Sequence, residues 1–343
     1  MKVLVWNGTR QIELQEMENP SLKKPSDAII RVTKTSICGT DLHPYRGHLP
    51  DFPEGTVMGH EFTGVIIEIG HDVQKVKVGD RVVVSDIVAC GTCWYCQKEL
   101  HYHCDSASLF GYGNVVGSYV PGGQAEYVRI PYADVVLLPI PDEVSDEKAL
   151  FAGDILATGY ACVEESGFQS GDTAIVIGGG PVGLMTALCA QAMGAQKVYI
   201  MESNKHRHEA AAKIGAIPFY PYEQERIRAA CGPGPDVVFE AVGKDETLLA
   251  ALRLVRPKGT VVCAGAHHSK AMPFNTEQAF AKEITLQFIV GNPIKYGPRL
   301  LEWIRSGVLD PTIIISHRAP FQDVVEAYRQ FDNQEILKVV LHF

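Results

Sequence analysis

The chain has 343 residues, 46% of them hydrophobic and 21% charged, with a formal net charge of −9. That length accommodates two domains with buried cores, and the composition is that of an ordinary globular protein. The scattered Lys and Arg residues argue against a nucleic-acid partner, and the absence of an apolar run of about 18 residues argues against a membrane span. The polar start, which includes Glu13, is unlike a signal peptide, so we expect a cytoplasmic location.

Residues 1–150 have the pattern of a β-rich domain. Short runs rich in β-branched residues alternate with Gly, Pro and Asp, which is typical of strands separated by turns. The expected strands cover residues 3–8, 27–35, 64–70, 81–85 and 125–131. A proline-containing linker near residue 140 then leads into the helical pattern of residues 146–153.

From about residue 155 the pattern changes to alternating strands and helices. Residues 173–202 predict a strand, a glycine turn, a helix and a second strand, and further strands are expected within 236–243, 259–266 and 284–291. This alternation predicts a doubly wound parallel sheet. The last strand, within 336–343, is expected to rejoin the β-rich domain. We therefore predict an α/β protein with domain segments 1–153, 154–294 and 295–343.

Four cysteines, Cys90, Cys93, Cys96 and Cys104, stand in the spacing C-x2-C-x2-C-x7-C. Such spacing suits four thiolates around one tetrahedral zinc, and a site closed by four sulfurs is structural rather than catalytic. Disulfides are disfavoured because the chain has five other cysteines and no export signal. An iron–sulfur cluster remains an alternative.

The segment 178–183, GGGPVG, fits the pattern G-x-G-x-x-G between a predicted strand and a predicted helix. In this context the glycines allow the backbone to approach a pyrophosphate at the helix N-terminus. Glu202 ends the next strand, where an acid hydrogen-bonds the adenosine ribose and repels a 2′-phosphate. The sequence therefore favours NAD over NADP. The alternative for the glycine segment is a turn that serves packing only, and the alternative for Glu202 is a solvated acid at the end of a strand.

Cys38 and His60 offer a thiolate and an imidazole, which are ligands suited to zinc. Taken alone, each of these residues is more often an ordinary core or surface residue than a metal ligand. A zinc with three protein ligands and one open position would act as a Lewis acid on an alcohol oxygen, which suits hydride transfer to a dinucleotide.

With these motifs in place, the chain resembles the medium-chain zinc-dependent alcohol dehydrogenase family. The matching stretches are spread over the whole chain in the order that the family has, and their combination is specific to that family. Its stretches are CGTDLH (38–43), GHE (59–61), the cysteine loop (90–104), GDILATGY (153–160) and GGGPVG (178–183). It implies a GroES-like catalytic domain, a Rossmann coenzyme domain, an active site in the cleft between them, and a homodimer or homotetramer.

By resemblance, Cys38 and His60 are catalytic zinc ligands and Glu61 lies behind the metal or exchanges with a ligand. Asp154 stands where many members have a cysteine as the third ligand. A carboxylate is an acceptable zinc ligand. Asp at this position is found in a branch of secondary-alcohol and formaldehyde-type dehydrogenases, which this chain resembles most. The implied cofactors are two zinc ions per subunit and NAD.

The resemblance also assigns a proton relay to Thr40 and His43. In the dinucleotide site, it places Thr158 against the nicotinamide, Arg207 near the adenosine ribose and Lys338 at the pyrophosphate. The full set of expected cofactor contacts is Thr158, Gly178, Gly180, Pro181, Val182, Gly183, Glu202, Arg207, Ala264, Gly265, Ala266 and Lys338.

The implied function is an NAD-dependent oxidoreductase that interconverts a primary or secondary alcohol with its aldehyde or ketone. The alternatives are a polyol or sugar dehydrogenase of the same family, for which the polar residue Asp86 speaks mildly, and a zinc-stabilised binding protein without turnover. A zinc-free quinone or enoyl reductase is disfavoured by the presence of Cys38, His60 and the cysteine loop.

Overall fold

The computed structural model describes residues 1–267, 271 and 275–343, and the chain forms two compact units. The first unit comprises Met1–Asp154 and Asn292–Phe343, and the second comprises Ile155–Gly291. The sequence analysis placed the boundaries after residues 153 and 294. The division instead falls after residues 154 and 291, which assigns Asp154 to the first unit.

The first unit contains mainly antiparallel sheets, to which both ends of the chain contribute, and its one parallel pair among the described strands joins the last two strands of the chain. In the main sheet the strands follow the order β10 (Leu137–Pro139), β6 (Arg81–Val84), β5 (Phe62–Ile69), β3 (Ala28–Ser36), β18 (Val339–His342) and β17 (His317–Pro320), and β9 (Tyr127–Ile130) also pairs with β3. The smaller sheets are β2 (Gln11–Glu16), β1 (Lys2–Gly8) and β4 (Thr56–Val57), and β7 (Ile87–Val88) with β8 (Ser108–Leu109). The antiparallel pairing of β18 with β3 returns the end of the chain to this unit, as the sequence predicted.

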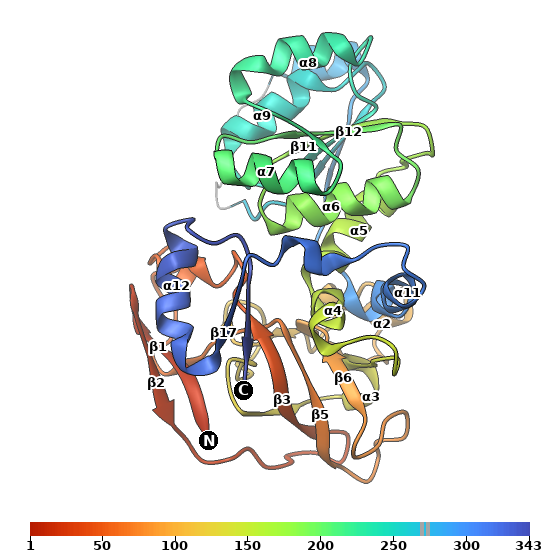
Figure 1. Cartoon of the computed structure of the whole chain (residues 1–343). Coiled ribbons are helices and arrows are strands. Elements are labelled where there is room, and N and C mark those ends of the chain that lie inside the picture. Colours follow the sequence, from red (N-terminus) through yellow and green to blue (C-terminus); the bar gives the residue numbers. More distant parts are fainter. Residues whose placement is uncertain (268–270, 272–274) are drawn as a thin grey trace. The chain divides into compact units, whose positions relative to one another are not determined.

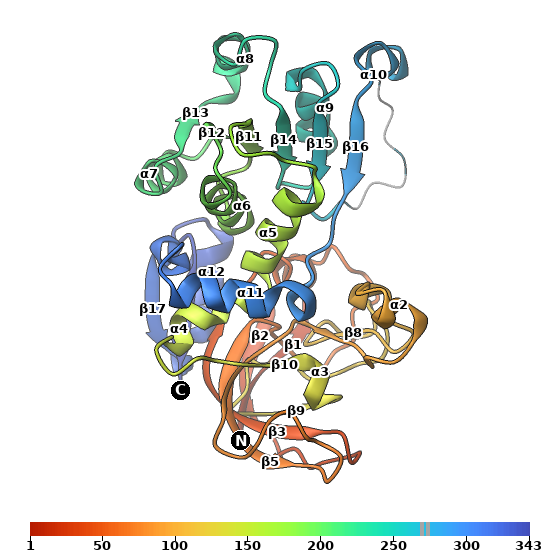
Figure 2. The same cartoon turned by 90° about the vertical axis from the view of Figure 1, so that its right-hand side faces the viewer.

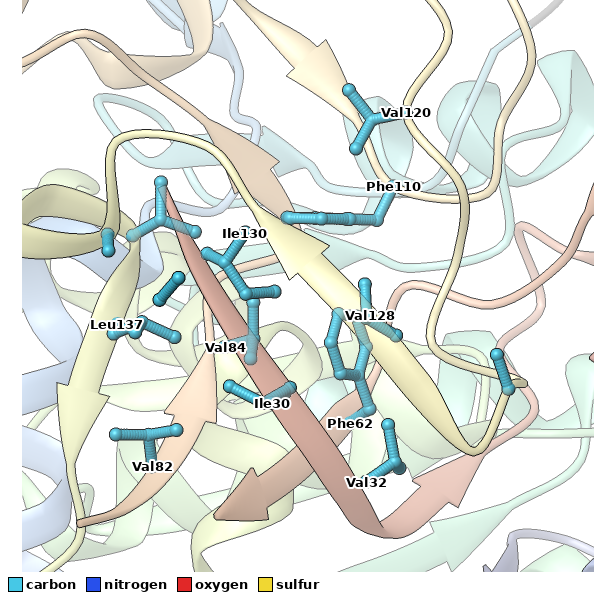
Figure 3. Close-up of a cluster of buried hydrophobic side chains, with 14 of the residues drawn as sticks. Ile30, Val32, Phe62, Val82, Val84, Phe110, Val120, Val128, Ile130 and Leu137 are labelled. Atoms are coloured by element: carbon cyan, nitrogen blue, oxygen red, sulfur yellow. The ribbon is translucent and has the colours of Figure 1, made fainter. Parts of the chain in front are cut away.

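The core of the first unit follows from the alternation of side chains along its strands. Ile30 and Val32 in β3 are completely buried, and they belong to one cluster with Phe62 from β5 and Val84 from β6. Figure 3 shows these side chains gathered around the sheet. Residues two apart on a strand share one face, so the β-branched runs of the sequence place their apolar side chains on the inside.

Short helices connect and flank these sheets. They are α1 (Leu42–Tyr45), α2 (Trp94–Gln97), α3 (Ala133–Val136), α4 (Asp146–Ala149), α11 (Pro293–Arg305) and α12 (Val324–Asp332), with 3₁₀ turns η1 (His101–His103), η2 (Leu150–Gly153), η4 (Pro311–Ile314) and η5 (Phe321–Asp323). Side-chain caps set two of the helix starts: Ser145 accepts from the N–H of Lys148 at α4, and Asn292 accepts from the N–H of Lys295 at α11.

The second unit is a doubly wound parallel sheet. Its strands stand in the order β13 (Ile217–Phe219), β12 (Lys197–Met201), β11 (Thr173–Ile177), β14 (Val237–Glu240), β15 (Thr260–Cys263) and β16 (Thr285–Phe288). Its helices are α5 (Ile155–Glu165), α6 (Pro181–Ala192), α7 (Lys205–Lys213), α8 (Gln224–Ala230), α9 (Asp245–Leu254) and α10 (Thr276–Lys282), with the 3₁₀ turn η3 (Pro221–Glu223). Figures 1 and 2 show α6 and α7 on one face of the sheet and α8 and α9 on the other.

The strand order in the second unit explains its ligand-binding potential. The chain winds outward from β11 to β13, returns to the centre and then winds the other way from β14 to β16. Ligands bind at the carboxyl ends of such strands, at the point where the order reverses. The predicted fold class, a β-rich GroES-like domain with a Rossmann domain, is therefore confirmed. Within the described residues, no helix has the length and apolar character needed to cross a bilayer.

Candidate functional site

Cys38, His60 and Asp154 meet in one buried cluster of the first unit. Cys38 follows β3, His60 precedes β5, and Asp154 follows η2. The Cys38 Sγ and the His60 Nε2 each lie 3.4 Å from the Asp154 Oδ2. One ligand atom from each of the three residues lies within 4.8 Å of those of the other two. Three residues that are far apart in sequence thus present a soft, a borderline and a hard ligand to one point.

This geometry fits a zinc ion. Ligand distances of about 2.0–2.3 Å in a tetrahedral site place neighbouring donor atoms about 3.3–3.8 Å apart. The two separations of 3.4 Å fall in that range. Three protein ligands leave a fourth position for water or substrate, as in catalytic rather than structural zinc sites.

Two of the three residues would have to release a proton on binding a metal. Burial and the Asp154 carboxylate raise the pKa of the Cys38 thiol to about 11. Burial alone would lower the pKa of His60, but the carboxylates of Asp41 and Asp154 raise it well above its usual value. Both residues therefore carry protons that a divalent metal would displace on binding.

Asp41 orients the histidine, a role that the sequence analysis missed. Its Oδ1 lies 3.2 Å from the His60 Nδ1, and its Oδ2 accepts from the Cys38 N–H at 2.9 Å. A carboxylate at this distance from the far nitrogen attracts its N–H electrostatically, which favours the ring orientation that leaves Nε2 for a metal. Asp41 lies within the CGTDLH stretch, but its spacing alone did not predict which residue it would contact.

Glu61 and Lys338 form a completely buried ion pair in the same unit. The Lys338 ammonium donates to Glu61 and, at 3.0 Å, to the carbonyl of Ile37. Burial would lower the pKa of Lys338, but the Glu61 carboxylate raises it. The structure thus shows Lys338 beside the metal cluster, and its contact with a pyrophosphate stays a prediction.

The cysteine loop contains a second set of possible metal ligands, which consists of four cysteines. The Cys90 Sγ lies 4.0 Å from the Cys96 Sγ, and the Cys93 Sγ lies 3.8 Å from the Cys104 Sγ. A tetrahedron of sulfurs about 2.3 Å from one metal has edges of about 3.8 Å. These separations exclude disulfide bonds, and all four cysteines are free. All four Sγ atoms lie within 4.8 Å of one another, which is too close for sulfurs spread around several irons and favours one tetrahedral ion.

Backbone N–H groups prepare the loop for negatively charged sulfurs. The Cys90 Sγ accepts from the N–H of Thr92 at 3.4 Å and of Cys93 at 3.3 Å. The Cys104 Sγ accepts from the N–H of Cys90 at 3.2 Å and of Ser106 at 3.3 Å. Burial would raise the pKa of Cys90, but hydrogen bonds with Thr92 and Cys93 lower it to about 6. A thiolate is the form that binds a metal.

Thr40 and His43, the predicted relay residues, lie in the turn that enters α1. Both side chains are half-buried, and the His43 N–H donates to the Thr40 carbonyl at 3.1 Å. The turn follows Cys38 directly, so a hydroxyl and an imidazole stand next to a ligand of the first cluster.

In the second unit, the three glycines of the predicted dinucleotide motif have different environments. Gly178 has a φ of +101°, which disfavours other residues. A Cβ on Gly183 would lie 1.9 Å from the Gly178 carbonyl oxygen, so this glycine permits close packing of α6 on β11. A Cβ on Gly180 would meet only Arg207 within 4 Å, so the backbone there is open. Pro181 and Val182 begin α6.

Glu202 and Arg207 lie at this glycine turn. The Glu202 carboxylate accepts from the N–H of Gly179 at 2.9 Å, of Ser203 at 2.7 Å and of Asn204 at 2.8 Å. The Arg207 Nη1 lies 3.5 Å from the same carboxylate. Burial would raise the pKa of Glu202, but the Asn204 N–H, Arg207 and the other donors lower it, so the group is ionised at neutral pH.

The remaining expected contacts are spread over the second unit. Thr158 lies half-buried on α5, close to the backbone of Gly291. Ala264 and Gly265 follow β15, and both of their N–H groups donate to the Glu240 carbonyl. The resemblance implies that the backbone of residues 264–266 contacts the nicotinamide carboxamide, and such contacts would therefore use other backbone groups, such as the carbonyl oxygens.

Comparisons with known proteins show the family to which the chain belongs. Residues 24–142 match the alcohol dehydrogenase GroES-like domain, and residues 181–306 match the zinc-binding dehydrogenase model. The chain is 32% identical to a zinc-type alcohol dehydrogenase-like protein, AdhB, of Bacillus subtilis, over 99% of this chain and 100% of the relative. It is also 30% identical to a sorbitol dehydrogenase of Bacillus subtilis, over 100% of this chain and 97% of the relative.

The same similarity appears among solved structures. The alcohol dehydrogenase TADH from Thermus sp. ATN1 superposes with a TM-score of 0.96 at 38% identity, covering 100% of this chain and 99% of the other. Both domain models, the full-length relatives and the two ligand clusters agree. The chain therefore belongs to the medium-chain zinc-dependent alcohol dehydrogenase family and is a zinc-dependent oxidoreductase that acts on alcohols.

Proposed function

We propose that this protein is an NAD-dependent alcohol dehydrogenase that holds a catalytic zinc at Cys38, His60 and Asp154 and a structural zinc at the cysteine loop. The observation that carries the proposal is the buried cluster of three ligands at tetrahedral spacing with a fourth position left for substrate. Asp154 as the third ligand supports the branch of secondary-alcohol and formaldehyde-type dehydrogenases.

The chemistry divides between the bound groups and the residues of the chain. Zinc would supply a Lewis acid for the substrate oxygen, and NAD would supply the hydride acceptor. Asp41 holds His60 in the orientation that a metal requires. The Thr40 hydroxyl would accept the proton of the alcohol while donating its own hydroxyl proton onward, and His43, a half-buried imidazole, would pass that proton to solvent.

The choice of NAD rests on Glu202. Its ionised carboxylate at the glycine turn would repel the 2′-phosphate of NADP. Arg207, 3.5 Å away, offsets part of that repulsion. The test is kcat/KM with each dinucleotide for the wild type and Glu202→Gln. We expect a clear preference for NAD that becomes smaller in Glu202→Gln, and a wild type that prefers NADP would contradict the assignment.

A homo-oligomer is part of the proposal. Among the described residues, β16 pairs only with β15, so it forms an edge of the sheet. Phe288 in β16 and Val290 after it are 61% and 58% exposed. An apolar edge strand of this kind favours pairing with a second copy. The mass in solution tests this, and a monomer at micromolar concentration would contradict it.

A polyol dehydrogenase is the second candidate function. The similarity to a sorbitol dehydrogenase and the buried polar residue Asp86 favour it. The deciding experiment for both candidates is a screen of primary alcohols, secondary alcohols and polyols with the zinc-loaded protein and NAD. Turnover of alcohols supports the proposal. A lack of turnover with all three classes, in protein with full zinc content, would favour the non-catalytic binding protein instead.

A further inference from the structure

Glu240, Cys263 and His267 form a third group of possible metal ligands, and this group lies in the second unit. One ligand atom from each residue lies within 4.8 Å of those of the other two. In the described part of the chain, only the two proposed zinc clusters bring metal-binding side chains together as closely. The group offers a carboxylate, a thiol and an imidazole, which are the kinds of ligand that the catalytic cluster offers. None of its residues is among the expected cofactor contacts.

The parallel sheet brings these three residues together. β14 and β15 are neighbours in the sheet, and Glu240 and Cys263 are paired in register at their carboxyl ends (Figure 2). After β15 the chain turns back over β14, since the N–H groups of Ala264 and Gly265 donate to the Glu240 carbonyl at 2.8 and 3.1 Å. This turn carries His267 to the Glu240 side chain, where its Nε2 lies 3.2 Å from the Oε2. The ligand atoms therefore meet because of backbone contacts and not through chance side-chain positions.

The Glu240 side chain is completely buried and is held so that one oxygen is left for a ligand. Its Oε1 accepts from the N–H groups of Val242 and Gly243 at 2.9 Å and from the Thr247 hydroxyl at 2.8 Å. Its Oε2 contacts only His267 among the described residues, none of whose Lys or Arg side chains pairs with Glu240. A carboxylate buried without a cation is costly. The surroundings of the Oε2 therefore favour a positive charge beside it.

Cys263 and His267 differ in their exposure, which gives the site an inner and an outer side. Cys263 is 2% exposed, and burial and the Glu240 carboxylate raise the pKa of its thiol to about 12. Its proton would be displaced by a divalent ion. The His267 side chain is 15% exposed, and its ring packs edge-on against Phe288 with the centroids 5.8 Å apart. An ion can therefore reach the buried ligands from the side of His267.

We propose that Glu240, Cys263 and His267 bind a third divalent ion of the zinc type. The separation of 3.2 Å between the His267 Nε2 and the Glu240 Oε2 is close to the edge of about 3.3–3.8 Å in a tetrahedral zinc site. A thiolate and an imidazole favour zinc, cobalt or nickel over magnesium and calcium, which prefer oxygen ligands. The ion would place a fixed positive charge beside the Glu240 carboxylate and would tie the segment after β15 to the end of β14.

This ion should bind more weakly than the catalytic zinc. The Asp41 carboxylate lies at the second ring nitrogen of His60, whereas the Nδ1 of His267 has no hydrogen-bond partner among the described residues. The loss of such a partner typically lowers metal affinity by about 10–100-fold. We therefore expect dialysis to remove this ion, so that dialysed protein retains only the zinc of the catalytic and structural sites.

The test begins with dialysed protein that holds its catalytic and structural zinc ions. Zinc is added in equilibrium dialysis, and elemental analysis gives the metal content per chain for the wild type, Cys263→Ala, His267→Gln and the control Cys231→Ala. Cys231 is a half-buried cysteine of the same unit that belongs to no ligand group of the described residues. The wild type and the control should bind one further ion. Both ligand variants should bind it more weakly by about tenfold or more.

Cobalt gives a second measurement that reports on the sulfur. Co²⁺ added to the dialysed zinc-containing protein should produce thiolate-to-cobalt absorption in the wild type and in Cys231→Ala. The same addition to Cys263→Ala should produce much less of this absorption, because the thiolate ligand is missing.

Two outcomes would overturn the inference. A wild type that binds no further zinc ion leaves a simple ion pair between His267 and Glu240. A further ion that all four proteins bind equally well lies elsewhere on the surface. If Cys263→Ala fails to fold, His267→Gln decides, because its side chain is partly exposed: weaker binding supports the site, and unchanged binding overturns it. Neither result bears on alcohol oxidation, which uses ligands of the first unit.

Discussion

At the scale of single residues, the position of Asp154 is compatible with two roles, that of a metal ligand and that of a helix cap. It directly precedes α5, where an aspartate commonly caps the first turn. Its carboxylate instead lies 3.4 Å from both the Cys38 Sγ and the His60 Nε2. These contacts favour the ligand role, because a cap would accept from the N–H groups of the helix.

The substitution Asp154→Asn separates the two roles. Asn caps a helix as well as Asp, so a capping residue would tolerate the change, whereas a ligand would not. We expect the zinc content to fall from about two to about one per chain and turnover to be nearly lost. Asp154→Cys is the control, since a thiolate retains the metal. Full zinc and near-normal turnover in Asp154→Asn would remove Asp154 from the ligand set.

The buried pair of Glu61 and Lys338 gives a second prediction at this scale. Lys338→Met leaves the Glu61 carboxylate buried without its cation, which should lower the free energy of unfolding by about 3–5 kcal/mol. The double variant Glu61→Gln with Lys338→Met removes both charges and should recover most of that loss. Urea unfolding of the three proteins measures the difference. A Lys338→Met protein as stable as the wild type would show that the pair carries no such energy.

At the scale of elements, the glycine turn between β11 and α6 combines two separable properties. Gly183 lets α6 approach the turn, whereas Gly180 leaves open space beside the backbone. The general roles of glycines in this motif are close packing and close approach of a pyrophosphate. Gly183 has the close packing, and Gly180 has the open space that such an approach would need. Matched alanine substitutions can therefore distinguish stability from cofactor binding.

Gly183→Ala should destabilise the protein by about 1–3 kcal/mol, because the new Cβ would lie 1.9 Å from the Gly178 oxygen. This cost exceeds the gain of about 1 kcal/mol that alanine brings to a helix. Gly180→Ala should leave stability within about 0.5 kcal/mol but raise the KM for NAD by about tenfold, since a methyl group obstructs the pyrophosphate. An unchanged KM in Gly180→Ala would argue against phosphate binding at this turn.

The elements were predictable because their signals are local. The β-branched runs of the first unit and the alternating strands and helices of the second predicted both fold types. The contacts of Lys338 and Asp41 were not predictable. Lys338 meets Glu61 from 277 residues away, and no local pattern specifies such a pairing. Asp41 is close to Cys38 in sequence, but its second contact, with His60, depends on how β3 and β5 pair.

At the scale of the whole molecule, all the ligands of the proposed catalytic and structural zinc ions belong to the first unit. Asp154 is the last residue of its N-terminal segment, one residue beyond the predicted boundary. The chain leaves this unit directly after the third ligand and returns at Asn292, which is bonded to the cysteine loop. Both of these zinc sites are thus internal to one unit, and each should be occupied independently of dinucleotide binding.

The two zinc sites should respond differently to loss of a ligand. Cys96→Ala opens the site that fastens the loop, so it should lower the thermal midpoint as well as the zinc content. Cys38→Ala should lower the zinc content by the same amount but keep a thermal midpoint close to that of the wild type. Equal thermal midpoints for Cys96→Ala and the wild type would contradict the structural role of the loop.

The most direct test of the account is the zinc content per chain, measured by elemental analysis on the wild type and Cys38→Ala alongside their rates of alcohol oxidation with NAD. The account predicts about two zinc ions in the wild type, about one in Cys38→Ala, and loss of turnover with the second ion. A wild type with one zinc ion, or a Cys38→Ala protein that retains both zinc ions and oxidises alcohols, would contradict it.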